Sequence, residues 1–406
     1  MFEGRHKFEI CAALSHKCSG MGIIMKFLYV APRYHTNQMD IMKGLTERGH
    51  EVRFISHYAA VIEDYSCVTP IVLGYSRLYR LIDFLYVKVI HRKDPTAIVF
   101  KIQHGFPPLR KLRKLICGFA PDLVILRERS VYSMAAYLIC KRKGNPCILY
   151  NQNPLWSEPA KKDFLHRVVN RMTPPLRMTP VMGEKRPGTV VRENDYFVPF
   201  VVNPQRTPKE RTYFDGGRIH ILCIGKYEIR KHHLELLRAA EQLRDKYEIR
   251  VTLVGEATNH FQKAYCEQVK AFVRERRMEN LITVKTNVPK RDMEGEYLAA
   301  DLYVIPSTLE MASVSQLEAM SYSLPVICSD TNGTSCYVED GVTGYLFRDC
   351  DEADLLSKLD DMLSDRERIL SMGAAGYRAV VEKYNFQSYF DTVTGMRERI
   401  LQERLR

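Results

Sequence analysis

The stretch that decides the fold is residues 301–347, which read DLYVIPSTLEMASVSQLEAMSYSLPVICSDTNGTSCYVEDGVTGYLF. Leu302 to Ile305 is an apolar run of strand length, and a Pro-Ser pair ends it. Residues 313–321 have the composition and spacing of a helix, with Ser313 or Ser315 as the expected N-cap. A strand that leads through a loop into a helix N-terminus predicts an anion site, because unpaired backbone N–H groups there favour a phosphate.

Two carboxylates bracket this corner. Glu310 lies at the end of the loop, and Glu318 lies in the helix between Leu317, Ala319 and Met320. An acid among apolar neighbours predicts a buried polar partner. The alternative is an ordinary doubly wound protein in which Glu310 is a solvated loop residue and Glu318 a surface helix residue.

The apolar run Leu324 to Cys328 and the glycines at 341 and 344 complete the pattern. The stretch resembles the donor-binding signature of retaining family-4 glycosyltransferases of the GT-B fold, PS-x-x-E-x7-E-A-M followed by x-P-V-I and D-G-x-x-G-x-L. The resemblance implies an α/β protein with two Rossmann-like, doubly wound domains facing across a cleft. A C-terminal helix would cross back to the N-terminal domain.

The resemblance also implies an activity. A hexose-type sugar would pass from an NDP-sugar, linked to UDP or GDP, to a hydroxyl with retention at the anomeric carbon and with no metal or other cofactor. Glu310 would contact the donor sugar and Glu318 the ribose hydroxyls. The backbone amides of Ala312, Ser313 and Val314 would cradle a phosphate.

A second donor segment follows the apolar run Ile219 to Ile224. The family pattern there is G-R-x(3–5)-K-G, and this chain has Gly225, then Lys226 in place of the arginine, Lys231 as the lysine, and His232 in place of the second glycine. Two cations at a helix start can neutralise a diphosphate, and Arg230 adds a bidentate fork that a lysine lacks. The alternative is a solvated basic loop.

By resemblance, Glu310, Lys226 and Lys231 would be the catalytic residues. The donor would also be held by Glu318, Arg230, Gly225 and the amides of residues 312–314, and Asn287 and Val288 would lie at the nucleobase.

The N-terminal half begins with a strand near Met25 and continues in β-loop-α-β order, which predicts a parallel sheet with ligands at the carboxyl ends of its strands. The polar residues expected at those ends form the acceptor side: His35, Asn37, Arg127, Arg129, Asn151 and Gln152. In many family members a histidine lies near the reacting sugar where Asn151 or Gln152 stands here. An amide cannot act as a general base near pH 7, so the acceptor-side chemistry stays open. His35 and Asn37 could instead cap the following helix.

Charge is distributed unevenly along the 406 residues. Residues 1–200 hold 31 Lys and Arg against 16 Asp and Glu, whereas the remainder holds 29 against 32. Residues 77–117 carry ten cations between apolar residues at helical spacing, a pattern that an anionic membrane surface binds. The alternative is a core-facing stripe with solvated charges. Nucleic acid is not expected, because aromatic side chains are not interleaved as stacking platforms.

These observations predict four parts: an N-terminal extension (1–24), an acceptor domain (25–203), a nucleotide-sugar domain (204–385) and a crossover helix (386–406).

No run of eighteen apolar residues occurs, no signal peptide is recognisable, and the eleven cysteines form no disulfide framework. We therefore expect a cytoplasmic protein that is peripheral on the inner face of the membrane. Its partners would be a nucleotide-sugar and a glycan or polyprenyl-diphosphate-linked acceptor in surface-polysaccharide synthesis, for capsule or lipopolysaccharide.

Two motifs are misleading by this interpretation. Asp349-Cys350-Asp351 imitates a DxD metal motif but precedes a helix, where acids act as caps. Asn332-Gly333-Thr334 fits a glycosylation sequon, but a turn is the better interpretation. Two rival functions remain at this stage, namely a nucleotide-sugar 2-epimerase of GT-B architecture and a degenerate binding subunit without activity.

Overall fold

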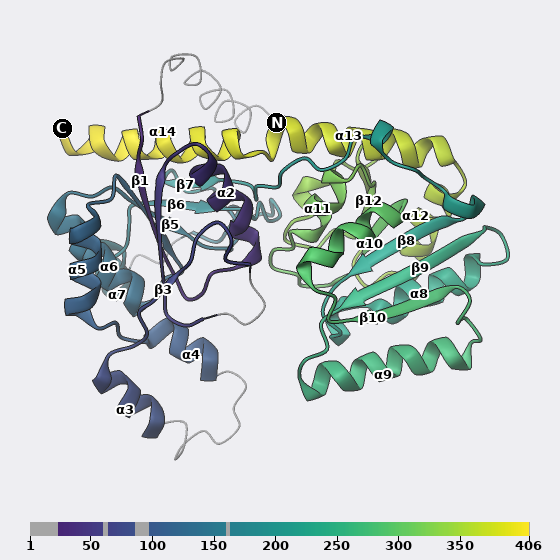
Figure 1. Ribbon diagram of the computed structural model, residues 1–406, viewed down its shortest axis with the longest axis horizontal. Coiled ribbons are helices and arrows are strands. Elements are labelled where there is room, and N and C mark those ends of the chain that lie inside the picture. Colours follow the sequence, from purple (N-terminus) through teal and green to yellow (C-terminus); the bar gives the residue numbers. More distant parts are fainter. Residues whose placement is uncertain (1–22, 60–63, 86–96, 160–162, 406) are drawn as a thin grey trace. The chain divides into compact units, whose positions relative to one another are not determined.

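The computed structural model describes residues 23–59, 64–85, 97–159 and 163–405 (Figure 1). They form two compact units. Unit 1 extends to Pro180 and adds Glu184–Val201 and the C-terminal segment from Phe386, while unit 2 comprises Val181–Gly183 and Val202–Asn385. Each unit is built around a parallel sheet of its own.

The sheet of unit 1 has seven parallel strands in the order β3-β2-β1-β4-β5-β6-β7. The central strands are continuous runs of apolar residues because helices cover both faces of such a sheet. Their bounds are β1 Lys26–Ala31, β2 Glu51–Ser56, β3 Ile71–Val72, β4 Leu123–Arg127, β5 Cys147–Tyr150, β6 Leu176–Thr179 and β7 Asp195–Phe197. The helices are η1 Thr36–Gln38, α2 Met39–Glu47, α3 Arg77–Leu85, α4 Ala97–His104, α5 Leu109–Phe119, α6 Val131–Lys143, α7 Phe164–Arg171 and α14 Phe386–Leu405.

The last helix, α14, returns to unit 1, as expected from the family resemblance. Figure 1 shows it running beside β1 and α2. The ring of Phe386 fills the space above Gly44, where a Cβ would lie only 2.1 Å from that ring. The hydroxyl of Tyr389 lies 3.0 Å from that of Tyr29 on β1. The helix is therefore part of the core of unit 1.

The two basic amphipathic helices of unit 1 differ in burial. On α5, Leu112 and Ile116 are buried in the core, so for this helix the alternative of a core-facing apolar stripe is confirmed. On α3, however, most of the apolar residues are more than half exposed, so that alternative is wrong. They are Leu78, Leu81, Ile82, Phe84 and Leu85. Val89, which shares their spacing in the sequence, lies outside the described residues.

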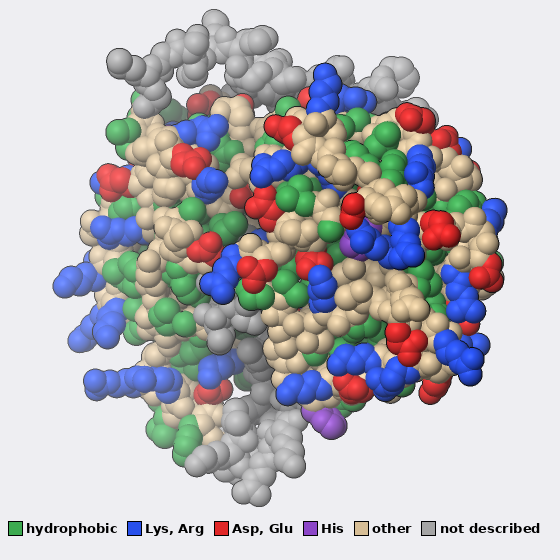
Figure 2. Space-filling view, turned by 45° about the vertical axis from the view of Figure 1, so that its right-hand side comes forward, with side chains coloured by type: hydrophobic (Ala, Val, Ile, Leu, Met, Phe, Trp, Pro, Cys, Tyr) green, Lys and Arg blue, Asp and Glu red, His purple; other side chains and the backbone are tan. Residues whose placement is uncertain are grey.

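Unit 2 contains six parallel strands in the order β10-β9-β8-β11-β12-β13. Acidic and basic side chains are interspersed over the right-hand side of Figure 2, where unit 2 lies. The strands are β8 Ile219–Ile224, β9 Ile249–Gly255, β10 Ile282–Thr286, β11 Leu302–Ile305, β12 Val326–Ser329 and β13 Gly344–Phe347. The main helices are α8 His233–Leu243, α9 His260–Glu275, α10 Met293–Ala299, α11 Ser315–Ser321, α12 Glu352–Leu363 and α13 Arg366–Lys383, with 3-10 turns η5 Ile229–Lys231 and η6 Lys290–Asp292.

Each sheet reverses its strand order once. In unit 1 the chain builds outward from β1 through β2 to β3 and then crosses to β4, and in unit 2 it builds from β8 through β9 to β10 and then crosses to β11. Ligands of open parallel sheets bind outside the carboxyl ends of the strands at such a switch point. The places to examine are therefore the loops after β1 and β4 and those after β8 and β11.

The expected helix caps are partly wrong. Helix α11 begins at Ser315 with Val314 at the N-cap, and no side chain caps it. The hydroxyls of Ser313 and Ser315 bond to one another instead, at 2.8 Å. At α12 the acidic cap is present, since the Asp351 carboxylate accepts the N–H of Asp354 at 2.9 Å. Among the described helices, none is both long enough and apolar enough to cross a membrane.

Candidate functional site

The switch point of unit 2 brings together the two segments that the sequence singled out. Turn η5, after β8, carries Arg230 and Lys231, and the loop after β11 carries Glu310. Both cations donate to Oε2 of Glu310, Arg230 from Nη1 at 2.7 Å and Lys231 from its ammonium. The backbone N–H of Thr308 donates to the carbonyl of Arg230 at 3.0 Å, which joins the two loops.

This cluster is largely removed from water. Only 8% of the Lys231 side chain and 13% of the Glu310 side chain are exposed. Burial alone would raise the pKa of Glu310, but the charge and hydrogen bonds of Lys231 and Arg230 outweigh it and hold the pKa below its usual value. Arg230 is also paired with Glu228 at 2.9 Å, whereas among the described residues Lys231 forms an ion pair with Glu310 alone. A buried lysine thus depends on one carboxylate.

Glu318 is held at the same edge of the sheet by two donors. Its Oε1 is paired with Lys290 and its Oε2 accepts the hydroxyl of Tyr297 at 2.7 Å. Burial, and next the charge of Glu318, raises the pKa of Tyr297 well above its usual value, so this hydroxyl remains a donor. The predicted polar partner of Glu318 is therefore present, and the alternative of a surface acid is wrong. Lys290 and Tyr297 were not predicted, since neither belongs to a recognisable pattern.

A turn supports the loop that carries Glu310. The N–H of Gly333 donates to the Glu310 carbonyl at 2.7 Å, and a Cβ at Gly333 would lie 2.1 Å from the carbonyl oxygen of Met311. The Asn332 carboxamide accepts the N–H of Thr334 at 3.0 Å, so the sequon is a buried turn. Only glycine allows this close approach of two backbones.

The amides expected to cradle a phosphate are not all available. The N–H of Ser313 donates to Oγ1 of Thr334 at 3.3 Å. Those of Ala312 and Val314 have no acceptor within the described parts of the chain. Two of the three predicted donors therefore remain for a ligand.

The structure does not bring every predicted donor residue to this cluster. The ammonium of Lys226 lies 3.3 Å from Glu256, beyond β9, and nearly half of that side chain is exposed. Gly225 lies under Lys231, whose Cδ would be 3.3 Å from an added Cβ. Asn287, at φ 55°, uses its carboxamide to accept the N–H of Ala257 at 2.9 Å, so it holds a loop, and Val288 follows it half-buried.

A pocket of about 510 Å³ lies at the switch point of unit 1. It contains five of the six predicted acceptor-side residues, from the end of β4 and the loops after β1, β4 and β5: His35, Arg127, Arg129, Asn151 and Gln152. Pro32, Arg33, Glu128, Ser130 and Asn153 complete its lining together with Tyr58, Ile102 and Gln103. The sequence therefore located this pocket, because each of these residues ends a strand, as Arg127 does, or follows one within four positions.

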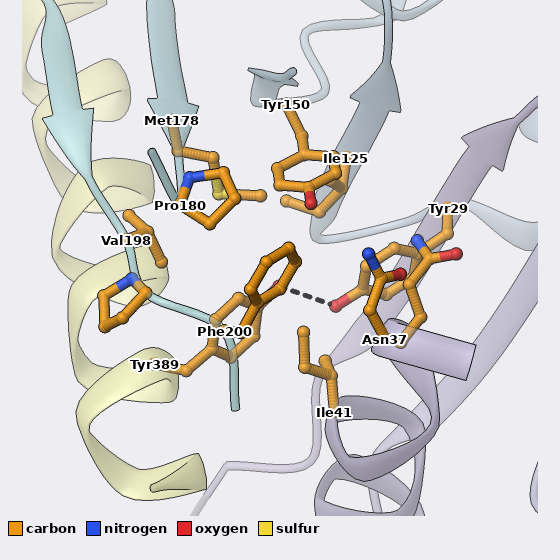
Figure 3. Close-up of a pocket in the computed structure, with 12 residues that line it drawn as sticks. Tyr29, Asn37, Ile41, Ile125, Tyr150, Met178, Pro180, Val198, Phe200 and Tyr389 are labelled. Atoms are coloured by element: carbon orange, nitrogen blue, oxygen red, sulfur yellow. Dashed lines mark hydrogen bonds between the residues drawn. The ribbon is translucent and has the colours of Figure 1, made fainter. Parts of the chain in front are cut away.

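Asn37, the sixth predicted residue, lies elsewhere. It lines a cavity of about 20 Å³, large enough for one water molecule, beneath α14 (Figure 3). Tyr29 and Tyr389 bond to one another across this cavity, and Ile41, Ile125 and Phe200 close it. The 3-10 turn η1 rotates Asn37 toward the core, while His35 stays at the larger pocket.

Asn151 is anchored by the unpredicted Arg177. Its Oδ1 accepts Nη1 of Arg177 at 3.0 Å and the N–H of Asn153 at 3.2 Å. Arg177 is buried and also forms a 2.6 Å ion pair with Asp195. No sequence motif marks Arg177, since it points from the middle of strand β6.

Comparison with known proteins agrees with this arrangement. The sequence profile of the family described as "Glycosyl transferases group 1" matches residues 205–379, which lie in unit 2. A glycosyltransferase from Rickettsia africae has a similar fold, with a TM-score of 0.68 at 14% identity, covering 94% of this chain and 99% of that one. The Anabaena protein HepE in complex with UDP-glucose gives a TM-score of 0.62 at 12% identity, over 93% of this chain and 99% of that one.

Two curated relatives are similar in sequence. The D-inositol 3-phosphate glycosyltransferase of Nocardia farcinica is 36% identical over 110 residues, 27% of this chain and 24% of that protein, so the alignment spans about a quarter of the relative. The sulfoquinovosyl transferase SQD2 of Arabidopsis thaliana is 30% identical over 396 residues, 89% of this chain and 69% of that protein. With both switch points in place and a relative aligned over most of its length, the chain belongs to the group 1 glycosyl transferases, which have the GT-B fold.

Proposed function

We propose that this chain is a retaining, family-4 glycosyltransferase that moves a hexose-type sugar from an NDP-sugar to a hydroxyl of a glycan or polyprenyl-diphosphate-linked acceptor in cell-surface polysaccharide synthesis. The observation that carries the proposal is the buried contact of Lys231 and Arg230 with Glu310 at the switch point of unit 2. Two adjacent cations at the carboxyl end of the strands can neutralise the two charges of a diphosphate. The UDP-glucose complex of the Anabaena neighbour supports the class of donor.

The chemistry follows from charge. As the bond between the sugar and the diphosphate breaks, negative charge gathers on the leaving diphosphate, and cations already fixed in place stabilise it in the transition state. Lys231 and Arg230 supply this charge, and the free amides of Ala312 and Val314 supply neutral donors. Glu310 contacts the donor sugar, and Glu318 receives the ribose hydroxyls. No metal is needed in this scheme, because the protein provides the positive charge.

The test is a thermal-shift panel of UDP- and GDP-sugars, followed by transfer of the best donor to lipid extracts. The proposal predicts stabilisation by one class of nucleotide-sugar, formation of a glycolipid with retained configuration, and loss of transfer in Glu310→Ala. Release of free epimer without any acceptor would identify a 2-epimerase instead. Donor binding with neither transfer nor hydrolysis would identify a binding subunit.

We also propose that unit 1 binds an anionic membrane surface from the inner, cytoplasmic side, where a lipid-linked acceptor would lie. The support is α3, which exposes Leu78 (70%), Leu81 (57%) and Ile82 (52%) beside Arg77 and Arg80. Apolar burial combines with about 1 kcal/mol for each cation near the headgroups.

Sedimentation with phosphatidylglycerol vesicles at low salt tests this surface. Leu78→Ser with Leu81→Ser should reduce binding several-fold, and raising the salt should reduce it further. The matched control is Phe164→Ser, which removes a 75% exposed side chain from α7 in the same unit. Equal binding by the wild type and the α3 variant would exclude α3 as the membrane surface.

A further inference from the structure

The pocket of unit 1 is lined chiefly by hydrogen-bond donors. Arg127 lies 3.6 Å from Glu128 and over the ring of Tyr150, 5.5 Å from its centre. Arg129, in the same loop, makes no hydrogen bond or ion pair with any described residue. A guanidinium offers five N–H donors and a fixed positive charge but no acceptor, so these two side chains favour a ligand that is rich in acceptors and negatively charged.

Asn151 contributes a third donor. Its Oδ1 is occupied by Arg177 and the N–H of Asn153, both of which can only donate, so the amide orientation is fixed. Its Nδ2 has no acceptor among the described residues. This atom is not sealed from solvent, so it can still donate to a ligand. Because Asn151 is 97% buried and lines the pocket, this N–H₂ group reaches the open volume of the pocket.

The charge around the pocket is not balanced. Burial and the neighbouring cations Arg192 and Arg177 lower the pKa of Arg129, and Asp195 only partly offsets them. Asp195 is already paired with Arg177 at 2.6 Å. Glu128 lines the same pocket, but it faces Arg127 rather than Arg129. Within the described parts of the chain, the site therefore keeps an excess of positive charge, because its two nearest acids are already paired with Arg127 and Arg177.

Helix α6 adds to this field. It is a helix of 13 residues that begins after Ser130, another lining residue, so its positive end lies at the pocket. Ser130 and Ser133 satisfy each other's amides in a capping box, which fixes the loop that carries Arg129. The arginines and the amide of Asn151 thus approach from two separate strand ends.

We propose that this pocket is an anion subsite that binds a phosphate group of the acceptor through Arg127, Arg129 and Nδ2 of Asn151. The inference rests on the proposed function, since it identifies the acceptor as a phosphate-bearing molecule. Phosphate fits better than a carboxylate because donors from two loops converge on the pocket, and a tetrahedral anion presents oxygens to both, whereas a single arginine fork satisfies a planar carboxylate.

The experiment measures binding to the full chain by calorimetry with two phosphate-bearing probes. One is glucose 1-phosphate, compared with glucose, and the other is undecaprenyl phosphate in phosphatidylcholine vesicles, compared with plain vesicles. We expect the phosphate to improve binding at least tenfold in one arm, and that arm tells whether the source is soluble or lipid.

The variants are chosen to preserve the fold. Arg129→Gln should weaken binding of the phosphate probe about tenfold. Asn151→Asp keeps the acceptor for Arg177 but replaces the N–H₂ donor with a carboxylate oxygen, and it should weaken binding at least as much. The control is Arg142→Gln, an exposed arginine at the far end of the same α6 helix, which should change nothing. UDP binding, measured on each sample, reports whether unit 2 is intact.

The outcomes separate the two proposals. If both probes bind no better than their neutral counterparts, or if Asn151→Asp binds the phosphate as well as the wild type, the anion subsite is wrong even though UDP still binds. If the phosphate probe binds and is lost in Arg129→Gln while no nucleotide-sugar binds or reacts, the subsite stands and the proposed transferase is wrong.

Discussion

Glu310→Gln is the substitution that tests the donor site most directly. The glutamine keeps the size and one acceptor but removes the charge that two cations share. Arg230 loses little, because it is 41% exposed and retains Glu228. Lys231 is 8% exposed and has no other carboxylate partner among the described residues, so it becomes an uncompensated buried charge. Breaking such a pair costs about 3 kcal/mol.

That cost appears as a change in melting temperature. For a domain of the size of unit 2, 1 kcal/mol corresponds to about 2–4 °C, so we expect the variant to melt about 6–12 °C below the wild type. Under the proposed function, the phosphates of UDP replace the lost carboxylate as the partner of Lys231. Saturating UDP should therefore stabilise Glu310→Gln by more degrees than it stabilises the wild type, although sugar transfer is lost.

Differential scanning fluorimetry with and without UDP provides the measurement, and Glu296→Gln is the matched control. The Glu296 side chain is also 13% exposed and is paired with Lys285 at 2.7 Å, but that lysine is 40% exposed. The control should melt only slightly lower and show the wild-type response to UDP. If UDP shifted both variants and the wild type equally, Lys231 would not be a phosphate ligand and the reasoning would fail.

Three further predictions concern single residues of unit 2. Gly333→Ala would place a Cβ 2.1 Å from a carbonyl oxygen of the donor loop, so UDP should bind at least tenfold more weakly by calorimetry, whereas Gly295→Ala, with open space around its Cβ, should leave affinity unchanged. Tyr297→Phe removes a 2.7 Å bond to a carboxylate and should lower the free energy of unfolding in urea by about 2 kcal/mol; no change would show that bond to be unimportant. Burial lowers the pKa of His220 to about 4. The contribution of His220 to stability should therefore be complete above pH 6.5 and decline by about 2 kcal/mol at pH 5, and His220→Gln should remove about that much of the decline in the urea profile, to which the buried His233 also contributes.

The sequence was sufficient to predict most of the architecture because parallel strands leave a strong local signal. Runs such as Leu302–Ile305 and Ile219–Ile224 are strands with the predicted bounds. Their polar ends were the right places to look, since five acceptor-side residues share one pocket. Once strand order places β8 beside β11, the meeting of Lys231 with Glu310 follows from topology alone.

What escaped prediction depends on packing across elements. Helices α3 and α5 carry the same alternation of cations and apolar residues, yet Leu81 is 57% exposed and Leu112 is fully buried. The pattern fixes which face is apolar but not what covers it. The rotation of Asn37 away from His35 and the anchoring of Asn151 by Arg177 likewise depend on neighbours that are far away in the sequence.

The contact between Lys231 and Glu310 also changes how the family signature is to be understood. By resemblance, the lysine is a ligand of the diphosphate and the glutamate is a ligand of the sugar. These roles would be independent of one another, since each residue would bind a different part of the donor. Without a ligand, a buried lysine needs another anionic partner, because desolvation of its charge costs several kcal/mol. Glu310 supplies this negative charge in the structure. Under the proposed function a phosphate of the donor would replace it, and its displacement would then free the carboxylate for the sugar. The two roles are therefore linked, so a substitution of either residue should alter binding of both the diphosphate and the sugar.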